Sequence, residues 1–248
     1  MSKIPRSSKR VHKQISSVPG LFEEFSPNIL SGWEGDLILR GESKDYDLPM
    51  QPSISRGQEL EEIPAFSDNP TTYITNEEIV EIEKFQKTLP NDKLFNSTRT
   101  NEDDINLLFL ARHYGIKTRF LDVTFDPLVA LYFACCSDFD ENGYIYFLTS
   151  SVGVEEKNIL TNNFKKAFDF NLNQHSSYIE HYKFINFLYR FPFSNNRVNA
   201  QKGAFLFNID PSKSLIDGTI VYEIQSHAKK GILEHLRFVN ISAESLGL

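Results

Sequence analysis

Two apolar helical runs joined by a short polar link constrain this chain more than any other feature. The first run ends near Gly115, and the second begins at Asp126 and Pro127. Aspartate as an N-cap followed by proline is a specific helix start, because the carboxylate accepts free backbone N–H groups and proline has none to lose. The helix predicted over residues 127–136 is apolar nearly all round, so we expect it to be buried at the centre of the fold.

The remaining pattern predicts an α+β fold. Further helices are expected over residues 76–89, from about 100 to 115, over 177–189 and over 226–236. Strands are expected over residues 35–40, 144–149, 203–208 and 218–224. Helices and strands do not alternate as βαβ units. We therefore expect a single domain with a small, mostly antiparallel sheet flanked by helices.

Composition narrows the class of protein. The chain has 248 residues and a net charge of -7, which argues against a generally basic nucleic-acid or membrane surface. Residues 1–18 are expected to form a flexible basic arm before a domain over residues 19–248. Cys135 and Cys136 are adjacent and cannot bridge each other, which indicates a reducing compartment. With no apolar run of ~18 residues, we expect a cytoplasmic protein without membrane contact.

Arg40 ends the apolar strand predicted over residues 35–40. A buried guanidinium must find an anionic or carbonyl partner, because leaving it unpaired is prohibitive. Two partners remain open, namely an internal carboxylate such as Asp122 and a ligand phosphate. Gly41, which follows, lets the backbone approach a ligand closely.

The link between the two helical runs carries more polar side chains than such a turn needs. Arg119 and Asp122 lie three apart, which suits a structural ion pair as well as a ligand site. His113 falls at a helix C-terminus, where it either caps terminal carbonyls or acts as a charged ligand group. Tyr114 would stack on an aromatic ligand ring or fill the core. Each of these alternatives stays open.

The same segments resemble the FRG domain, a family named after a Phe/Tyr-Arg-Gly triplet. Here the triplet reads Leu39-Arg40-Gly41, with leucine in place of the aromatic residue. The second family motif matches residues 112–134, with Arg112 where glutamine is usual and Lys117 where proline is usual. Two shorter elements also match in register. They contribute Pro52, Ser53 and Arg56, and then Arg197, Gln201, Gly203 and Phe205.

The resemblance implies a bacterial or phage-borne protein of a defence or toxin-like system. The layout is also similar to that of ADP-ribosyltransferases, which suggests an ADP-ribosyltransferase-like fold. By that similarity Arg40 would hold NAD, Gly41 would bind its carboxamide, and Ser53 would lie near the ribose. Gln201 would stand where those enzymes have a glutamate, and an amide cannot supply negative charge or act as a base.

The sequence hypothesis is therefore an NAD-using effector with ADP-ribosyltransferase-like chemistry. Its expected catalytic residues are Arg40, His113 and Gln201, and its expected ligand-binding residues are Gly41, Ser53, Arg56, Tyr114 and Arg119. NAD is the expected co-substrate, a protein or nucleic acid is a possible target, and no metal is expected. The alternative is a non-catalytic module that recognises a nucleotide or a protein. A phosphodiester hydrolase using His113 lacks a second histidine or a metal set.

Overall fold

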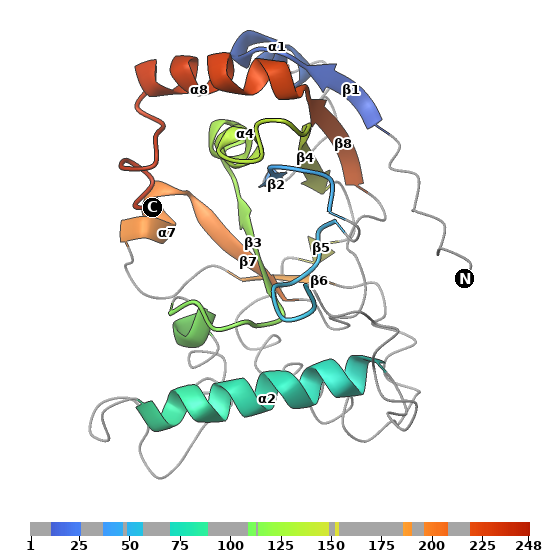
Figure 1. Cartoon of the computed structure of the whole chain (residues 1–248), viewed down its shortest axis with the longest axis vertical. Helices are drawn as coiled ribbons and strands as arrows, with labels where there is room; N and C mark the ends of the chain where they lie inside the picture. Colours follow the sequence, from blue (N-terminus) through green and yellow to red (C-terminus); the bar gives the residue numbers. More distant parts are fainter. Residues whose placement is uncertain are drawn as a thin grey trace.

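Eight strands in the described residues form one mixed sheet at the centre of an α+β domain (Figure 1). The computed structural model describes residues 11–25, 37–46, 49–56, 70–88, 109–112, 114–148, 152–153, 186–189, 196–207 and 219–248. Across the sheet the order is β1 (Val11–Ile15), β8 (Thr219–Ile224), β4 (Gly143–Leu148), β2 (Ile38–Glu42), β3 (Phe120–Thr124), β7 (Gly203–Phe207), β6 (Asn186–Tyr189) and β5 (Val152–Gly153).

Neighbouring strands run antiparallel except in the β1–β8 and β5–β6 pairs. The α+β class and the mostly antiparallel sheet are confirmed. The sheet is larger than the small one that we expected, because several strands come from segments without a clear strand pattern.

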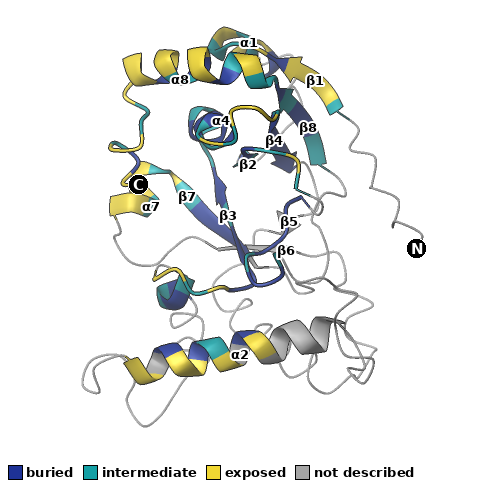
Figure 2. Ribbon diagram, viewed as in Figure 1, coloured by how far each residue is buried: buried dark blue, intermediate teal, exposed yellow. Residues whose placement is uncertain are grey.

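Helix α4 (Pro127–Cys135) begins where the sequence predicts. Asp126 is its N-cap, and Oδ1 accepts a hydrogen bond from the Leu128 backbone N–H at 2.8 Å. The helix lies on one face of the sheet with α8 (Lys229–Phe238) beside it (Figure 1). Figure 2 shows it mostly in the colour of buried residues. Its apolar side chains join those of β2, β4, β8 and α8 in the main core, so the prediction of a central buried helix is confirmed.

Two glycines let strands touch α4 directly. A Cβ atom on Gly41 of β2 would lie 2.0 Å from the Ala130 carbonyl oxygen, and one on Gly143 of β4 would lie 2.0 Å from that of Ala134. Real Cβ atoms do not approach so closely, so both positions require glycine for packing. This contact fixes the height of the Arg40-Gly41 end of β2 above the helix.

Buried Lys229, at the start of α8, ties three elements together. Its Nζ donates hydrogen bonds to the main-chain oxygens of Ser43 at 2.5 Å, Ser137 at 3.1 Å and Asp138 at 2.8 Å. Burial lowers the pKa of this ammonium group. The bonds connect the segment after β2 to the segment after α4, which further fixes where β2 ends.

Helix α2 (Pro70–Thr88) covers the helix predicted over residues 76–89 and begins earlier. Ile82 and Phe85 are buried, as their spacing predicts. The helix predicted to stop at Gly115 does so. The backbone N–H of Ile116 donates to Ala111 O at 3.0 Å, and Gly115 has a φ of 82°, which together form a Schellman C-cap. Of this helix, residues 109–112 are described.

The N-terminal segment departs from expectation. Residues 11–15, which we placed in a flexible arm, form strand β1 and pair with β8. Helix α1 (Val18–Glu24) follows directly. An edge strand needs only one hydrogen-bonded side, so its exposed positions tolerate the basic residues that suggested an arm. Residues 1–10 lie outside the described residues.

Two further segments differ from the predicted pattern. Residues 120–124, expected in the link between helices, form β3 in the middle of the sheet. Residues 186–189, expected in the helix over 177–189, form β6 and pair with β7, while residues 177–185 are not described. Short aromatic and apolar runs fit either structure by periodicity, and tertiary pairing decides between them.

Candidate functional site

A cavity of about 380 Å³ opens where β2 and β3 separate. The two strands share one register pair, Leu39 opposite Thr124. Beyond it the Arg40 side chain spans the gap, because Nη1 donates to the Asp122 main-chain oxygen at 2.6 Å. The opening lies at the end of β2 that Gly41 fixes against α4. The sheet thus places polar groups of two neighbouring strands around one space.

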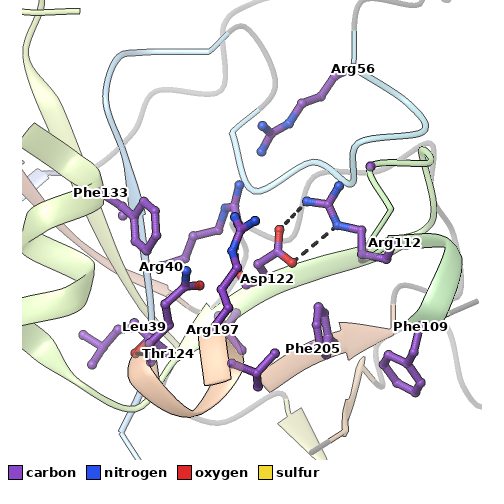
Figure 3. Close-up of a pocket in the computed structure, with 15 residues that line it drawn as sticks. Leu39, Arg40, Arg56, Phe109, Arg112, Asp122, Thr124, Phe133, Arg197 and Phe205 are labelled. Atoms are coloured by element: carbon purple, nitrogen blue, oxygen red, sulfur yellow. Dashed lines mark hydrogen bonds and ion pairs between the residues drawn. The ribbon is translucent and has the colours of Figure 1, made fainter. Parts of the chain in front are cut away.

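Four arginines line the cavity and give it positive charge. They are Arg40, Arg56, Arg112 and Arg197. Figure 3 shows Asp122 between Arg197 and Arg112. Among the described residues that line the cavity, Asp122 is the only carboxylate. Three phenylalanines, Phe109, Phe133 and Phe205, provide apolar walls. Guanidinium groups around an open space are suited to phosphate, because their planar N–H groups match its oxygens.

A buried carboxylate behind the cavity orients two of these arginines. The side chain of Glu42 is 1% exposed, and its Oε1 accepts hydrogen bonds from Arg40 Nε at 2.9 Å and Arg56 Nη2 at 3.2 Å. Glu42 also accepts from the Met50 backbone N–H at 3.3 Å, which ties in the loop over residues 49–56. A buried carboxylate with several donors is a rigid anchor. Glu42 is therefore a positioning residue for the site.

Arg56 reaches the cavity from that loop. Its Nε donates to the Gln51 main-chain oxygen at 3.0 Å, and its guanidinium lies 5.1 Å from the centre of the Tyr46 ring. Burial lowers the pKa of Arg56, and the neighbouring charge of Arg40 lowers it further. The charge of Glu42 acts in the opposite direction, and this shared carboxylate holds the two cations close to each other.

Arg112 and Asp122 form an ion pair on the cavity wall (Figure 3). Arg112 Nη2 bonds Asp122 Oδ2, and Nε lies 3.4 Å from Oδ1. Burial by surrounding protein atoms raises the pKa of Asp122, but the charge and hydrogen bond of Arg112, with the charges of Arg40 and Arg197, outweigh it, so this pKa is lowered. Asp122 is therefore a charged carboxylate, and its side chain is 46% exposed.

The third side of the cavity comes from α7 (Asn196–Ala200) and the turn after it. Gln201 Nε2 donates to the Leu246 main-chain oxygen at 2.9 Å, and Thr124 Oγ1 donates to the Gln201 main-chain oxygen at 2.7 Å. Because Nε2 bonds Leu246, the other end of the amide group is the oxygen Oε1, which can only accept hydrogen bonds. Gly247 lies against Arg197. The C-terminal segment thus supports the wall that carries Arg197 and Gln201.

The structure brings four of the sequence-predicted site residues together and sets others apart. Arg40, Gly41, Arg56 and Gln201 line the cavity. Ser53 lies behind it, where Oγ accepts from Arg112 Nη1 at 3.4 Å and from the Thr118 backbone N–H at 3.2 Å. Tyr114 is 66% exposed and its ring lies 5.5 Å from that of Phe85 on α2, so it does not border the cavity. His113 lies outside the described residues.

Arg119 is fully buried away from the cavity. Its Nε donates to Glu78 Oε2 on α2 at 2.6 Å, and its backbone N–H donates to Oε1 at 2.7 Å. The ion pair that we expected between Arg119 and Asp122 is therefore wrong in its partners. Arg119 directly precedes β3 and Asp122 lies within it. Side chains three residues apart along an extended segment point to opposite faces, so each charged group has a separate partner.

Several cavity residues were not among the predicted site residues. Arg112 stands where the family motif usually has glutamine. This departure could have identified it as a site residue, because the arginine is the partner of Asp122. Arg197 belongs to the same short element as Gln201. Nothing in the sequence around Glu42 indicates its role, apart from its position directly after Gly41. Its burial depends on the fold of residues 49–56, which local pattern does not reveal.

Comparison with known proteins identifies one family. The model of the FRG domain matches residues 35–143, so this part of the chain is an FRG domain. The match includes β2, β3 and α4 but ends before Arg197 and Gln201. A search of curated proteins and one of solved structures each gave no match.

No helix in the described part of the chain is long and apolar enough to cross a membrane. Among the same residues, no group of three or more His, Cys, Asp or Glu side chains is placed to hold a metal ion.

Proposed function

We propose that this FRG-domain protein binds a phosphate-bearing nucleotide, NAD in particular, in the arginine-lined cavity and cleaves it with ADP-ribosyltransferase-like chemistry. The observation that carries the proposal is the convergence of Arg40, Arg56, Arg112 and Arg197 on one cavity in a chain whose net charge is -7. Such a local reversal of charge favours an anionic ligand, because it raises the local concentration of anions.

The size and walls of the cavity support a nucleotide. A volume of about 380 Å³ falls in the range of about 300–1,000 Å³ typical of small-molecule sites. Phenylalanine walls suit a base or a nicotinamide ring, while the arginines suit a pyrophosphate. Nη2 of Arg40 and Nη1 of Arg56 donate no hydrogen bond to any residue that the structure describes. These donors are the ones we assign to the phosphate oxygens.

The proposed reaction breaks the bond between C1′ of the ribose and the nicotinamide nitrogen. The electron pair of that bond leaves with nicotinamide, which becomes neutral, and positive charge develops on the ribose. The Asp122 carboxylate stabilises that charge, since its low pKa keeps it ionised. Water or a hydroxyl of a target then attacks C1′ and releases its proton to solvent. Gln201 Oε1 would accept a hydrogen bond from a ribose hydroxyl.

A non-catalytic recognition module is the second candidate. Its specific support is that the two groups with most catalytic potential are already bonded within the protein, Asp122 to Arg112 and Gln201 to Leu246. The setting suggested by the family resemblance, a bacterial defence or toxin system, belongs to the same proposal. Either candidate uses the same arginine-lined cavity.

The test is incubation of the protein with NAD, alone and with a bacterial lysate. Nicotinamide release is measured by chromatography, and modified targets are sought by mass spectrometry. We expect release by the wild type and loss of release in Asp122→Asn, with Asp140→Asn as a control that removes an exposed carboxylate outside the cavity. Binding of NAD without release would favour the recognition module. Neither binding nor release would contradict both candidates.

A further inference from the structure

Asp122 is in an unusual place for a carboxylate, in the wall of a cavity that otherwise attracts anions. Its side chain is 46% exposed and lies between Arg112 and Arg197 in Figure 3. The charges of Arg112, Arg40 and Arg197 all act on it. A buried carboxylate behind the arginines, Glu42, already orients two of them. Asp122 holds a third arginine, Arg112, and nearly half of its side chain still faces the open space, which a purely orienting carboxylate does not need.

An anion that enters the cavity meets Asp122 in two ways. It is repelled by the carboxylate, and it must compete with the carboxylate for Arg112, whose Nε and Nη2 both bond Asp122. Both effects weaken the binding of a ligand that carries negative charge alone. For two like charges about 7 Å apart at an effective dielectric constant of about 20, the repulsion that remains after screening by salt weakens binding on the order of tenfold.

A cationic group experiences the opposite effect. The cavity is positive on the side of Arg40 and Arg56, and it is negative at Asp122. The oxidised nicotinamide ring of NAD carries a positive charge, and its pyrophosphate carries negative charge. A ligand with this pattern gains from Asp122 what a purely anionic ligand loses. The reduced form NADH has nearly the same shape without the ring charge, so it separates charge from fit.

We propose that Asp122 is a specificity-determining residue that selects ligands in which phosphate is joined to a cationic ring and rejects ligands that carry phosphate alone. The proposal rests on the proposed nucleotide function and deepens it by naming the charge pattern of the ligand. A purely structural Asp122 that only holds Arg112 has the opposite consequence. Its removal would release Arg112 and weaken the binding of every anion.

The experiment compares three proteins and three ligands by calorimetric titration. The proteins are the wild type, Asp122→Asn and Asp140→Asn, the last with the same change in net charge outside the cavity. The ligands are ADP-ribose, NADH and NAD, and chromatography measures any nicotinamide release, in which case the non-cleavable carbocyclic analogue of NAD, which keeps the cationic ring, replaces NAD. Thermal unfolding of each protein verifies that it is folded, and Asp122→Ser serves as a second variant should the asparagine variant not fold.

We expect the wild type to bind NAD more tightly than NADH. Asp122→Asn should bind ADP-ribose and NADH about tenfold more tightly than the wild type and lose most of the preference for NAD. Asp140→Asn should match the wild type. If the wild type binds but Asp122→Asn binds ADP-ribose equally or more weakly, the selective role is wrong while the nucleotide site stands. If no protein binds any of the three ligands, the proposed function fails, and this inference fails with it.

Discussion

Two arginine–carboxylate pairs from neighbouring parts of the chain have opposite surroundings. Arg119 and Glu78 are 0% exposed and join the start of β3 to α2. Arg112 and Asp122 are 24% and 46% exposed and border the cavity. Residues 109–124 hold three of these four groups. The sealed pair holds the fold together, because both of its charges are buried away from water, whereas the open pair can exchange protein contacts for ligand contacts.

This contrast distinguishes a structural ion pair from a ligand-binding one, although their arginines lie only seven residues apart in the chain. A buried charge that loses its partner is costly, while an exposed charge that loses its partner is solvated by water. The sealed pair should therefore dominate stability, and the open pair should dominate binding. The changes below to charged residues each test one side of that division, and a change at Gly41 tests the packing that positions the site.

The largest effect is expected from Arg119→Ala. It leaves the Glu78 carboxylate buried without its guanidinium, and breaking such a pair costs on the order of 3–5 kcal/mol of unfolding free energy. Denaturant unfolding measures the change. The matched variant of the open pair, Arg112→Ala, should cost about 1 kcal/mol or less. Equal losses of unfolding free energy in the two variants would show that the burial of an ion pair does not determine how much it stabilises this protein.

Gly41→Ala should cause the next largest loss of stability. The added Cβ would lie 2.0 Å from the Ala130 carbonyl oxygen, so β2 or α4 must move. Overpacking of this kind costs about 1–3 kcal/mol. Gly231→Ala on α8 is the control, because a Cβ there meets nothing within 4 Å. It should stabilise the helix by up to about 1 kcal/mol. Thermal unfolding of both variants measures the effect. A Gly41→Ala variant that melts at the wild-type temperature would contradict the close packing of β2 on α4.

Arg197→Ala should separate binding from stability. Arg197 is exposed on α7 and lines the cavity, so its loss should change the free energy of unfolding by less than about 0.5 kcal/mol. Binding of ADP-ribose should weaken about tenfold, the scale of one charge-assisted hydrogen bond. Lys230→Ala, at an exposed position of α8, removes the same charge outside the cavity. Equal binding by Arg197→Ala and Lys230→Ala would remove α7 from the site.

The smallest effect is expected in the pH dependence of stability. The pKa of Asp122 is lowered in the folded protein, so its contribution is present above the ordinary carboxyl pKa of about 4 and is lost as pH falls through the lower folded value. Because the pair is partly exposed, the contribution should be about 1 kcal/mol or less. Unfolding measured from pH 7 to pH 3 should decline less steeply in Asp122→Asn. Parallel curves would deny the pair any stabilising role.

Sequence alone revealed the helix around which the domain is built. Asp126, Pro127 and the apolar run after them form a local signal, and local signals do not depend on the rest of the fold. The strand predicted over residues 35–40 also forms, but as β2 over Ile38–Glu42, so that Arg40 lies in the middle of the strand and not at its end. Strand β3 was not predicted, because residues 120–124 become a strand only by pairing with β2 and β7.

The site was predictable to the extent that its residues lie in motifs. Arg40, Gly41, Arg56 and Gln201 were predicted and line one cavity, yet the partners of the charged groups were not. Glu78 reaches Arg119 from a distant helix, and Glu42 becomes an anchor only when residues 49–56 fold over it. Arg119 and Asp122 are only three residues apart in the sequence, but side chains alternate along an extended strand, so these two point to opposite faces.

Titration of ADP-ribose into the wild type and into Arg40→Lys tests the central claim most directly. Arg40 Nε is fixed on Glu42 and Nη1 on the Asp122 main-chain oxygen, an arrangement that a lysine cannot reproduce. We expect saturable binding by the wild type, competition by pyrophosphate, and affinity at least about tenfold weaker in a folded Arg40→Lys variant. No saturable binding by the wild type, or equal affinities of the two proteins, would contradict it.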